Sequence, residues 1–127
     1  MFEVGDIVRF YSPTAGKEKF HLCLGQRGGV PVFAFLHLNS GAGYRGDLPL
    51  DDGLAPGLPP SPTGKTVVSF SIVVQISAER LTKFGAQKTG SIDGHLAGDL
   101  AGFAKTLTVL SRPDRTFVVA ALETLFS

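Results

Sequence analysis

The chain has 127 residues, of which 43% are apolar and 18% are charged, and its formal net charge is +1. This length suits one domain of roughly 100–150 residues, and the apolar share excludes a chain that is disordered throughout. A net charge this small gives no global field that would attract nucleic acid, so an RNA site would have to be a local patch of cations. We therefore expect residues 1–127 to form a single domain.

The only cysteine, Cys23, lies between two leucines, and a lone cysteine excludes an internal disulfide. We interpret it as a reduced thiol in the core; the alternative is a nucleophile, because His21 would share its strand face. The first six residues contain no basic stretch leading into an apolar run, so we expect no signal peptide. The longest apolar run, 67–76, is far shorter than the ~20 residues of a membrane span. We expect a cytoplasmic protein that does not contact membranes.

The first part of the chain has the pattern of short β-strands separated by turns. Residues 7–11 are rich in β-forming side chains, and the polar residues 14–19 predict a loop. Residues 20–24 alternate in hydrophobicity with period two, which places His21 and Cys23 on one face and the apolar side chains on the other. This alternation predicts a half-buried strand.

The middle of the chain predicts two further long strands. Residues 30–38 are apolar on both faces, which is typical of a central strand covered on both sides. After a short 48–50 piece, residues 51–64 contain four prolines and predict a long surface loop, either functional or a tolerated insertion. Residues 66–77 give the clearest strand. One apolar face of that strand is expected to comprise Val68, Phe70, Ile72, Val74 and Ile76.

The last third changes to a helical period. Apolar residues spaced by four, four, three and four predict a helix over about 91–107, capped by Ser91 or Asp93. Glycines recur every four residues along the same helix, at Gly94, Gly98 and Gly102, and form a stripe without side chains on one helix face. Each glycine costs up to ~1 kcal/mol against alanine, so we expect a close backbone approach along this stripe. Residues 117–126 fit a last helix better than a strand.

Five or six short strands followed by a helix predict a mostly β protein, a small antiparallel barrel with a C-terminal helix packed on it. Several short motifs then resemble one family in their order along the chain. They are Gly5-Asp6-Ile7-Val8, Pro13-Thr14-Ala15-Gly16 with Glu18, Thr66-Val67-Val68, and Gln75 with Ser77 and Glu79-Arg80-Leu81. Together they resemble the MazF/PemK (Kid-like) toxins of type II toxin–antitoxin systems. The resemblance covers about residues 4–107 and leaves 108–127 as a C-terminal extension.

The resemblance implies an SH3-like barrel that forms a homodimer. It also implies an endoribonuclease that cleaves single-stranded RNA without a metal ion or other cofactor, and an antitoxin protein as partner. Such cleavage needs a base for the 2′-hydroxyl, an acid for the leaving oxygen and positive charge for the phosphorane. The family supplies an arginine before its second strand, a threonine or serine after the next strand, and often an Arg-x-Asp on the late strand.

This chain departs from the family at each of these places. Lys19 is the nearest match to the arginine, although lysine lacks the planar fork that grips a phosphate bidentately. Ser40 is the match to the threonine or serine, and the charged pair of the late strand maps onto the neutral Ser69 and Ser71. The resemblance therefore implies catalytic roles for Lys19 and Ser40, with RNA contacts at Ser69 and Ser71.

Other side chains could compensate for these losses. Lys17 and Arg45 could hold phosphates, and Tyr44 could stack on a base. His21 has an ordinary pKa suited to proton transfer near neutral pH, and we add it to the predicted catalytic set. The alternative without a functional role is that the cations are solvated loop residues and that His21 is a hydrogen-bonded part of the scaffold. Of the other histidines, we expect His37 in the core and His95 on the surface.

Three functional hypotheses follow. The first is a toxin-like, metal-independent endoribonuclease. The second is a catalytically inactive barrel that binds RNA or a protein partner, which the loss of charge at Ser69 and Ser71 favours. The third is an unrelated small β domain with an accidental motif match, because a fold alone does not determine a function.

Overall fold

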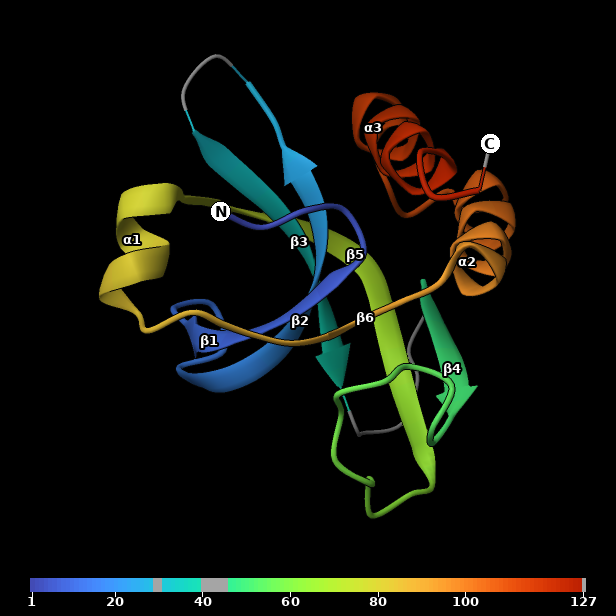
Figure 1. Ribbon diagram of the computed structural model, residues 1–127. Helices are drawn as coiled ribbons and strands as arrows, with labels where there is room; N and C mark the ends of the chain where they lie inside the picture. Colours follow the sequence, from blue (N-terminus) through green and yellow to red (C-terminus); the bar gives the residue numbers. More distant parts are fainter. Residues whose placement is uncertain (29–30, 40–45, 127) are drawn as a thin grey trace.

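The computed structural model describes residues 1–28, 31–39 and 46–126. Predictions made for Ser40, Tyr44 and Arg45 therefore lie outside the described residues. The elements are, in chain order, β1 (Asp6–Ser12), β2 (Lys17–Gln26), β3 (Val32–Asn39), β4 (Asp47–Asp51), β5 (Lys65–Ser77), α1 (Ala78–Lys83), β6 (Gln87–Ser91), α2 (Gly94–Lys105) and α3 (Arg112–Glu123) (Figure 1).

The described strands form one antiparallel sheet in the order β4-β5-β3-β2-β1-β6. The sheet is strongly curled; α1 lies on one side of it and α2 and α3 lie on the other (Figure 1). This arrangement confirms the prediction of a mostly β protein with antiparallel strands and C-terminal helices. None of the helices in the described residues has the length and apolarity needed to cross a bilayer.

Both faces of the sheet are packed, which divides the buried side chains into two clusters. The helix-side core lies between the sheet and the pair α2 and α3, and includes Ile7, Leu22, Leu24, Leu36, Val68, Phe70, Leu100 and Leu122. The α1-side core lies on the opposite face and consists of Val8, Phe10, Cys23, Phe33, Phe35, Val74, Ile76 and Leu81. Residues of β3 enter both clusters alternately, which confirms the prediction of a central strand covered on both sides.

The alternation predicted for β2 is also confirmed. Leu22 and Leu24 belong to the helix-side core, and Cys23 is fully buried in the α1-side core. Burial raises the pKa of the Cys23 thiol to about 11, which suits a core residue and opposes a thiolate nucleophile. The strand starts earlier than predicted, however. Lys17 pairs with Ser12 across a turn that Gly16 closes with a positive φ of 71°, so Lys17 and Lys19 are strand residues and not loop residues.

The single apolar face predicted for β5 is wrong. The pairing of β5 with β3 shifts register between the Phe35–Val74 pair and the His37–Ser69 pair, so β5 bulges over residues 70–73. Val68 and Phe70 therefore face the helix-side core, whereas Val74 and Ile76 face the α1-side core. Ile72, inside the bulge, is 52% exposed. One strand thus supplies both cores.

The helix predicted over 91–107 is confirmed as α2, and Asp93 caps it by accepting a hydrogen bond from the Leu96 amide at 2.8 Å. A Cβ on Gly94 would lie 2.6 Å from the Leu125 carbonyl oxygen, so the predicted close approach exists there. The prediction is wrong for the other two glycines of the stripe, Gly98 and Gly102, which face open space. The last helix, α3, is confirmed and begins at Arg112, after its cap Ser111.

Two elements, α1 and β6, were not identified from the sequence. Helix α1 has six residues, and Ser77 caps it by accepting a hydrogen bond from the Arg80 amide. Strand β6 is Gln-Lys-Thr-Gly-Ser, which shows no apolar alternation because it is an edge strand and its residues are mostly exposed. Its only strand partner in the described residues is β1.

The loop between β4 and β5 crosses the molecule as a packed segment, which we call the proline strap (residues 52–64). Ala55 is buried in the helix-side core, and Leu58 packs against the same core. A Cβ on Gly90 would lie 2.1 Å from the Pro56 carbonyl oxygen, and one on Gly57 would lie 2.2 Å from the Thr89 carbonyl oxygen. The strap therefore contacts β6 backbone to backbone, and only glycine fits at both positions.

Candidate functional site

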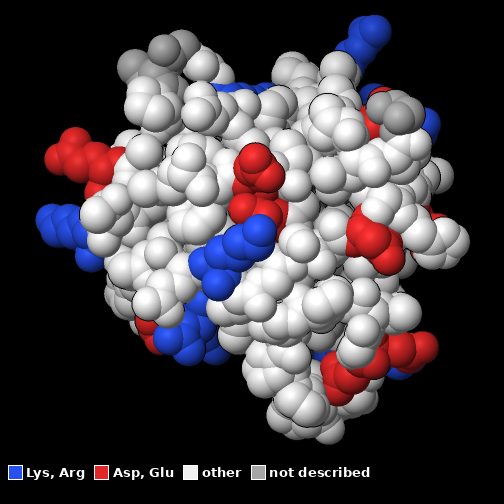
Figure 2. Space-filling view, in the orientation of Figure 1, with Lys and Arg blue, Asp and Glu red and all other residues white. Residues whose placement is uncertain are grey.

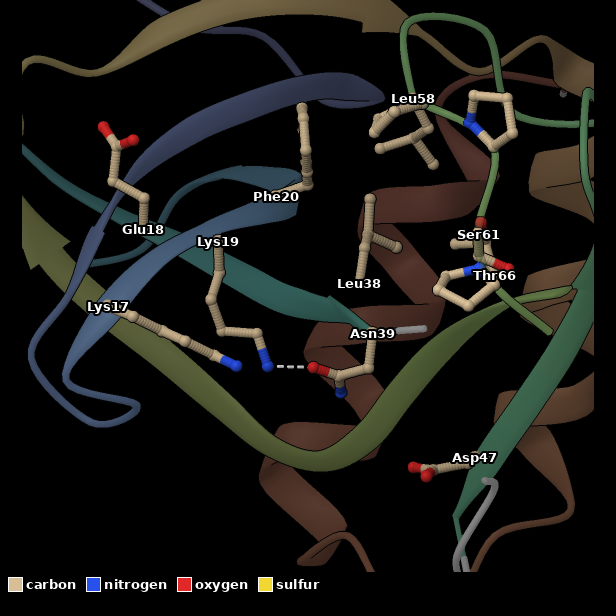
Figure 3. Close-up of a pocket in the computed structure, with 13 residues that line it drawn as sticks. Lys17, Glu18, Lys19, Phe20, Leu38, Asn39, Asp47, Leu58, Ser61 and Thr66 are labelled. Atoms are coloured by element: carbon tan, nitrogen blue, oxygen red, sulfur yellow. Dashed lines mark hydrogen bonds between the residues drawn. The ribbon is translucent and has the colours of Figure 1, made fainter. Parts of the chain in front are cut away.

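Two lysines and an asparagine meet where β2 begins and β3 ends. Lys17 and Lys19 are two residues apart on β2 and so share one face of the sheet. Phe20 pairs with Leu38, which brings Lys19 beside Asn39, and the Lys19 ammonium donates a hydrogen bond to the Asn39 side-chain oxygen. Figure 3 shows both ammonium groups directed toward Asn39, whereas the Glu18 side chain extends in the opposite direction. We call Lys17 and Lys19 the lysine pair.

The lysine pair borders a cavity of about 700 Å³ between the strand ends and the proline strap. The strap contributes one wall and β2 and β3 contribute the facing wall (Figure 3). The lining residues are Lys17, Glu18, Lys19, Phe20, Leu38, Asn39, Asp47, Leu58, Pro59, Pro60, Ser61, Pro62 and Thr66. Cations at one end and apolar side chains along both walls would suit an anionic ligand with a flat apolar part.

The cavity lining carries two lysines and two carboxylates, Glu18 and Asp47, so an anion is favoured only beside the lysine pair. Partial burial lowers the pKa of Lys19, and the positive charge of Lys17 lowers it further. Among the described residues, neither lysine forms an ion pair with a carboxylate. A bound anion would relieve the repulsion between the two ammonium groups. Elsewhere the charges are dispersed: on the face in Figure 2, lysine and arginine side chains are scattered among uncharged ones.

A row of polar side chains crosses the sheet next to the lysine pair. His21 pairs with His37, His37 with Ser69, and Ser69 with Asp47, so the row spans β2, β3, β5 and β4. The ring of His37 lies 3.3 Å from the Ser12 hydroxyl, measured from Nε2 to Oγ. Burial and the nearby charge of Lys19 lower the pKa of His37, so this imidazole is neutral at pH 7 and can accept a proton.

His21, predicted as a catalytic residue, lies inside the protein. Its ring stacks on Phe10 with centroids 3.7 Å apart, and the residue has no exposed surface. Neither ring nitrogen has a hydrogen-bond partner among the described residues, and burial lowers the pKa of His21 to about 3, with the charge of His37 as a smaller cause. Because side chains alternate along β2, His21 lies on the same sheet face as both Lys19 and the buried Cys23. His21 therefore cannot touch a substrate in this conformation.

The other predicted site residues fall into three groups. Lys17 and Lys19 lie together at the cavity. Ser69 and Ser71 are hydrogen-bonded to each other, with 3.0 Å between their hydroxyl oxygens, and neither lines the cavity. Ser40, Tyr44 and Arg45 are outside the described residues.

Sequence reasoning missed several residues of the site. Asn39 comes beside Lys19 through the pairing of Phe20 with Leu38, and that register depends on an irregularity between Cys23 and Gln26 that the sequence does not reveal. His37 was expected in the core, but it is only partly buried because β3 extends beyond the α1-side core. His95 is on the surface as predicted, with 90% of its side chain exposed. The contribution of the proline strap depends on tertiary packing and has no local signal.

Within the described residues, no group of three or more His, Cys, Asp and Glu side chains is placed to hold a metal ion. Comparisons of the chain with protein-family models and with curated proteins find no match. The resemblance to MazF/PemK toxins and the functions it implies therefore stay predictions. The site is characterised by its geometry: a lysine pair, a cavity lined by both apolar and polar side chains, and an adjacent row of polar side chains that ends at Asp47.

Proposed function

We propose that this protein is an SH3-like barrel of the MazF/PemK type that binds single-stranded RNA at the lysine pair. The observation that supports this proposal best is the pair itself: two ammonium groups without a described carboxylate partner, bordering a cavity that also has apolar walls. RNA backbones present phosphates that such a pair can contact, and unpaired bases present flat apolar faces. A duplex fits less well, because its bases are stacked on each other and cannot enter a cavity.

The proposal favours binding over catalysis at the residues first predicted. His21 is inaccessible, and Ser69 and Ser71 are neutral and bonded to each other. Binding needs only the cations and the cavity walls, all of which are present. The small net charge of +1 also means that the affinity must come from these local contacts and not from a general basic surface.

Fluorescence anisotropy with a labelled single-stranded RNA would test the proposal. We expect the double variant Lys17→Ala/Lys19→Ala to lose roughly tenfold or more in affinity. The slope of log K against log salt should also become shallower by about 1.4, which is the expectation for two lost phosphate contacts on a single strand. Anisotropy reports the fraction of RNA that is bound, so this test concerns binding and not cleavage.

The matched control is Lys83→Ala/Lys105→Ala, which removes the same charge from α1 and α2, away from the cavity. This control should keep the wild-type affinity and salt slope. Equal losses in both double variants would show that only overall charge matters. That result, or no RNA binding by the wild type, would refute the proposal.

A second candidate, metal-independent cleavage of the bound RNA, is favoured by His37. It is the partly buried, neutral imidazole nearest to Lys19 along the polar row, so a base and a phosphate-binding cation are neighbours. Long mixed-sequence RNA would be incubated with the protein in EDTA, beside the variants Lys19→Ala, His37→Ala and His21→Leu. Discrete cuts that are lost with His37→Ala and kept with His21→Leu would support this candidate. RNA that stays intact at protein excess would mean that the protein binds RNA without cleaving it.

A further inference from the structure

The walls of the cavity are apolar where they lie beyond the lysine pair. Leu58 and three prolines of the strap form one wall, and Phe20 and Leu38 form the other. Figure 3 shows Leu58 directed toward the side of the cavity that Phe20 and Leu38 occupy. Prolines and leucine give a surface with few polar atoms, which is a suitable face for an aromatic ring.

We propose that this cavity holds one unstacked nucleotide unit, with its phosphate on the lysine pair and its base between Leu58 and Phe20. The inference rests on the proposed RNA binding and adds to it: the strap would contact the base, so binding would depend on the base as well as on the phosphates. A cavity of about 700 Å³ is within the range of roughly 300–1,000 Å³ that small-molecule sites occupy.

Polar groups at the edge of the cavity match the polar edge of a base. The Asn39 side-chain oxygen accepts from Lys19, and its amide nitrogen makes no hydrogen bond to a described residue. The Thr66 hydroxyl lines the cavity and likewise has no described partner. A bound base could give a hydrogen-bond partner to both groups.

The strap is held in place before any ligand arrives. The Ser61 amide donates to the Asp52 carboxylate at 2.9 Å, and the Asp52 amide donates to the Gly64 carbonyl at 3.1 Å. The backbone contact of Gly57 with β6 fixes the far side of the strap. A wall that is already ordered costs little entropy on binding, which favours a selective site.

Two labelled strands of equal length would test the proposal by anisotropy: a single-stranded RNA with bases, and the corresponding abasic ribose-phosphate strand. We expect the wild type to bind the base-bearing strand at least tenfold more tightly. Leu58→Ala should reduce this ratio about threefold or more, because it removes one wall. Leu54→Ala is the matched control, because Leu54 belongs to the same strap but is 55% exposed and does not line the cavity. It should leave the ratio unchanged.

NMR of the wild-type protein titrated with uridine or adenosine monophosphate gives a test that needs no variant. Amide shifts concentrated at Phe20, Asn39 and Thr66 would support nucleotide binding in the cavity. If free nucleotides shift these amides while RNA strands do not bind, the cavity serves a free nucleotide and the proposed RNA function is wrong.

The two proposals fail in different ways. Equal affinity for both strands, with full dependence on the lysine pair, would overturn the proposal that the cavity holds a base and would leave the RNA-binding proposal intact. Shifts produced equally by inorganic phosphate and by nucleotides would also overturn it, since the base would then contribute nothing. Absence of binding to either strand would overturn the RNA proposal itself.

Discussion

The two faces of the sheet differ in how they use the same strands. The helix-side face is apolar over its whole length and is covered by α2 and α3. The opposite face is apolar only beneath α1; farther along the same strands it becomes polar, with Ser12, Lys19, His37, Asn39 and Ser69. The helix-side face therefore supplies the larger core and, through Phe20, Leu38 and the strap residue Leu58, the apolar walls of the cavity. The opposite face supplies a smaller core at one end and the polar side chains of the candidate site at the other.

The largest effect should come from the helix-side face. Leu36 is fully buried between the sheet and the helices, so Leu36→Ala removes apolar contacts and leaves a cavity. We expect a loss of about 2–5 kcal/mol in the free energy of unfolding, measured by chemical denaturation. A loss of less than about 1 kcal/mol would mean that this face is not the main source of stability.

An intermediate and pH-dependent effect should come from His21, which lies between the α1-side core and the polar part of the same face. Its folded pKa of about 3 is below the ordinary value of 6.5. The unfolded chain therefore binds a proton that the folded chain does not, and stability decreases as the pH falls from about 6.5 toward 3. At pH 4.5 the loss relative to pH 7.5 should be roughly 2–3 kcal/mol from this residue.

His21→Leu should remove that part of the pH dependence, since leucine does not titrate. Denaturation curves at pH 7.5 and 4.5 would measure it, with His95→Ala as a control because His95 is exposed. An unchanged pH dependence in His21→Leu would show that His21 is not buried as a neutral ring. At pH 7.5 the variant should be about as stable as the wild type, because the unpartnered ring nitrogens are gone.

A smaller effect should come from the link between β2 and α3. Arg27 is 2.7 Å from the Asp114 carboxylate, and its guanidinium lies 4.6 Å from the centre of the Phe117 ring. Both charged side chains are partly exposed, so we expect Arg27→Ala to cost only about 1 kcal/mol. The salt bridge alone is tested by Asp114→Asn, which should cost less than Arg27→Ala; an equal or larger cost would assign the effect to the ion pair alone.

The smallest effect on stability should come from the polar half of the second face. Ser69→Ala removes one hydroxyl of a pair that includes the exposed Ser71. We expect a change within about 0.5 kcal/mol in the free energy of unfolding. If Ser69→Ala were as costly as Leu36→Ala, the polar half would be a structural element and the distinction between the faces would not hold.

Local patterns predicted most of the fold. The alternation in β2, the doubly apolar β3 and the helical period of α2 all correspond to elements of the structure. Residues 66–77 were predicted as a strand, but not the bulge that turns Val74 and Ile76 to the other face, because a bulge depends on pairing with β3. The edge strand β6 gave no signal, since it buries little.

The candidate site was less predictable, because its parts are distant in sequence. Lys19 was predicted as the nearest match to the arginine of the family motif and Lys17 as a compensating cation, but Asn39, the partner of Lys19, is set by the hairpin register. His21 was chosen for its chemistry, and only the packing of Phe10 against it reveals its burial. The strap wall could not be inferred, since prolines show that a segment is extended but not which surface it crosses.

The contact of Gly57 with Gly90 joins points that are far apart along the chain, and this has a kinetic consequence. The hairpins from β1 to β3 can close through nearby contacts, whereas the strap reaches its final position only once β6 has paired with β1. Cavity formation should therefore be among the last events of folding and among the first reversed by local opening. Molecules with a complete central sheet should therefore form earlier than molecules in which the cavity is also closed.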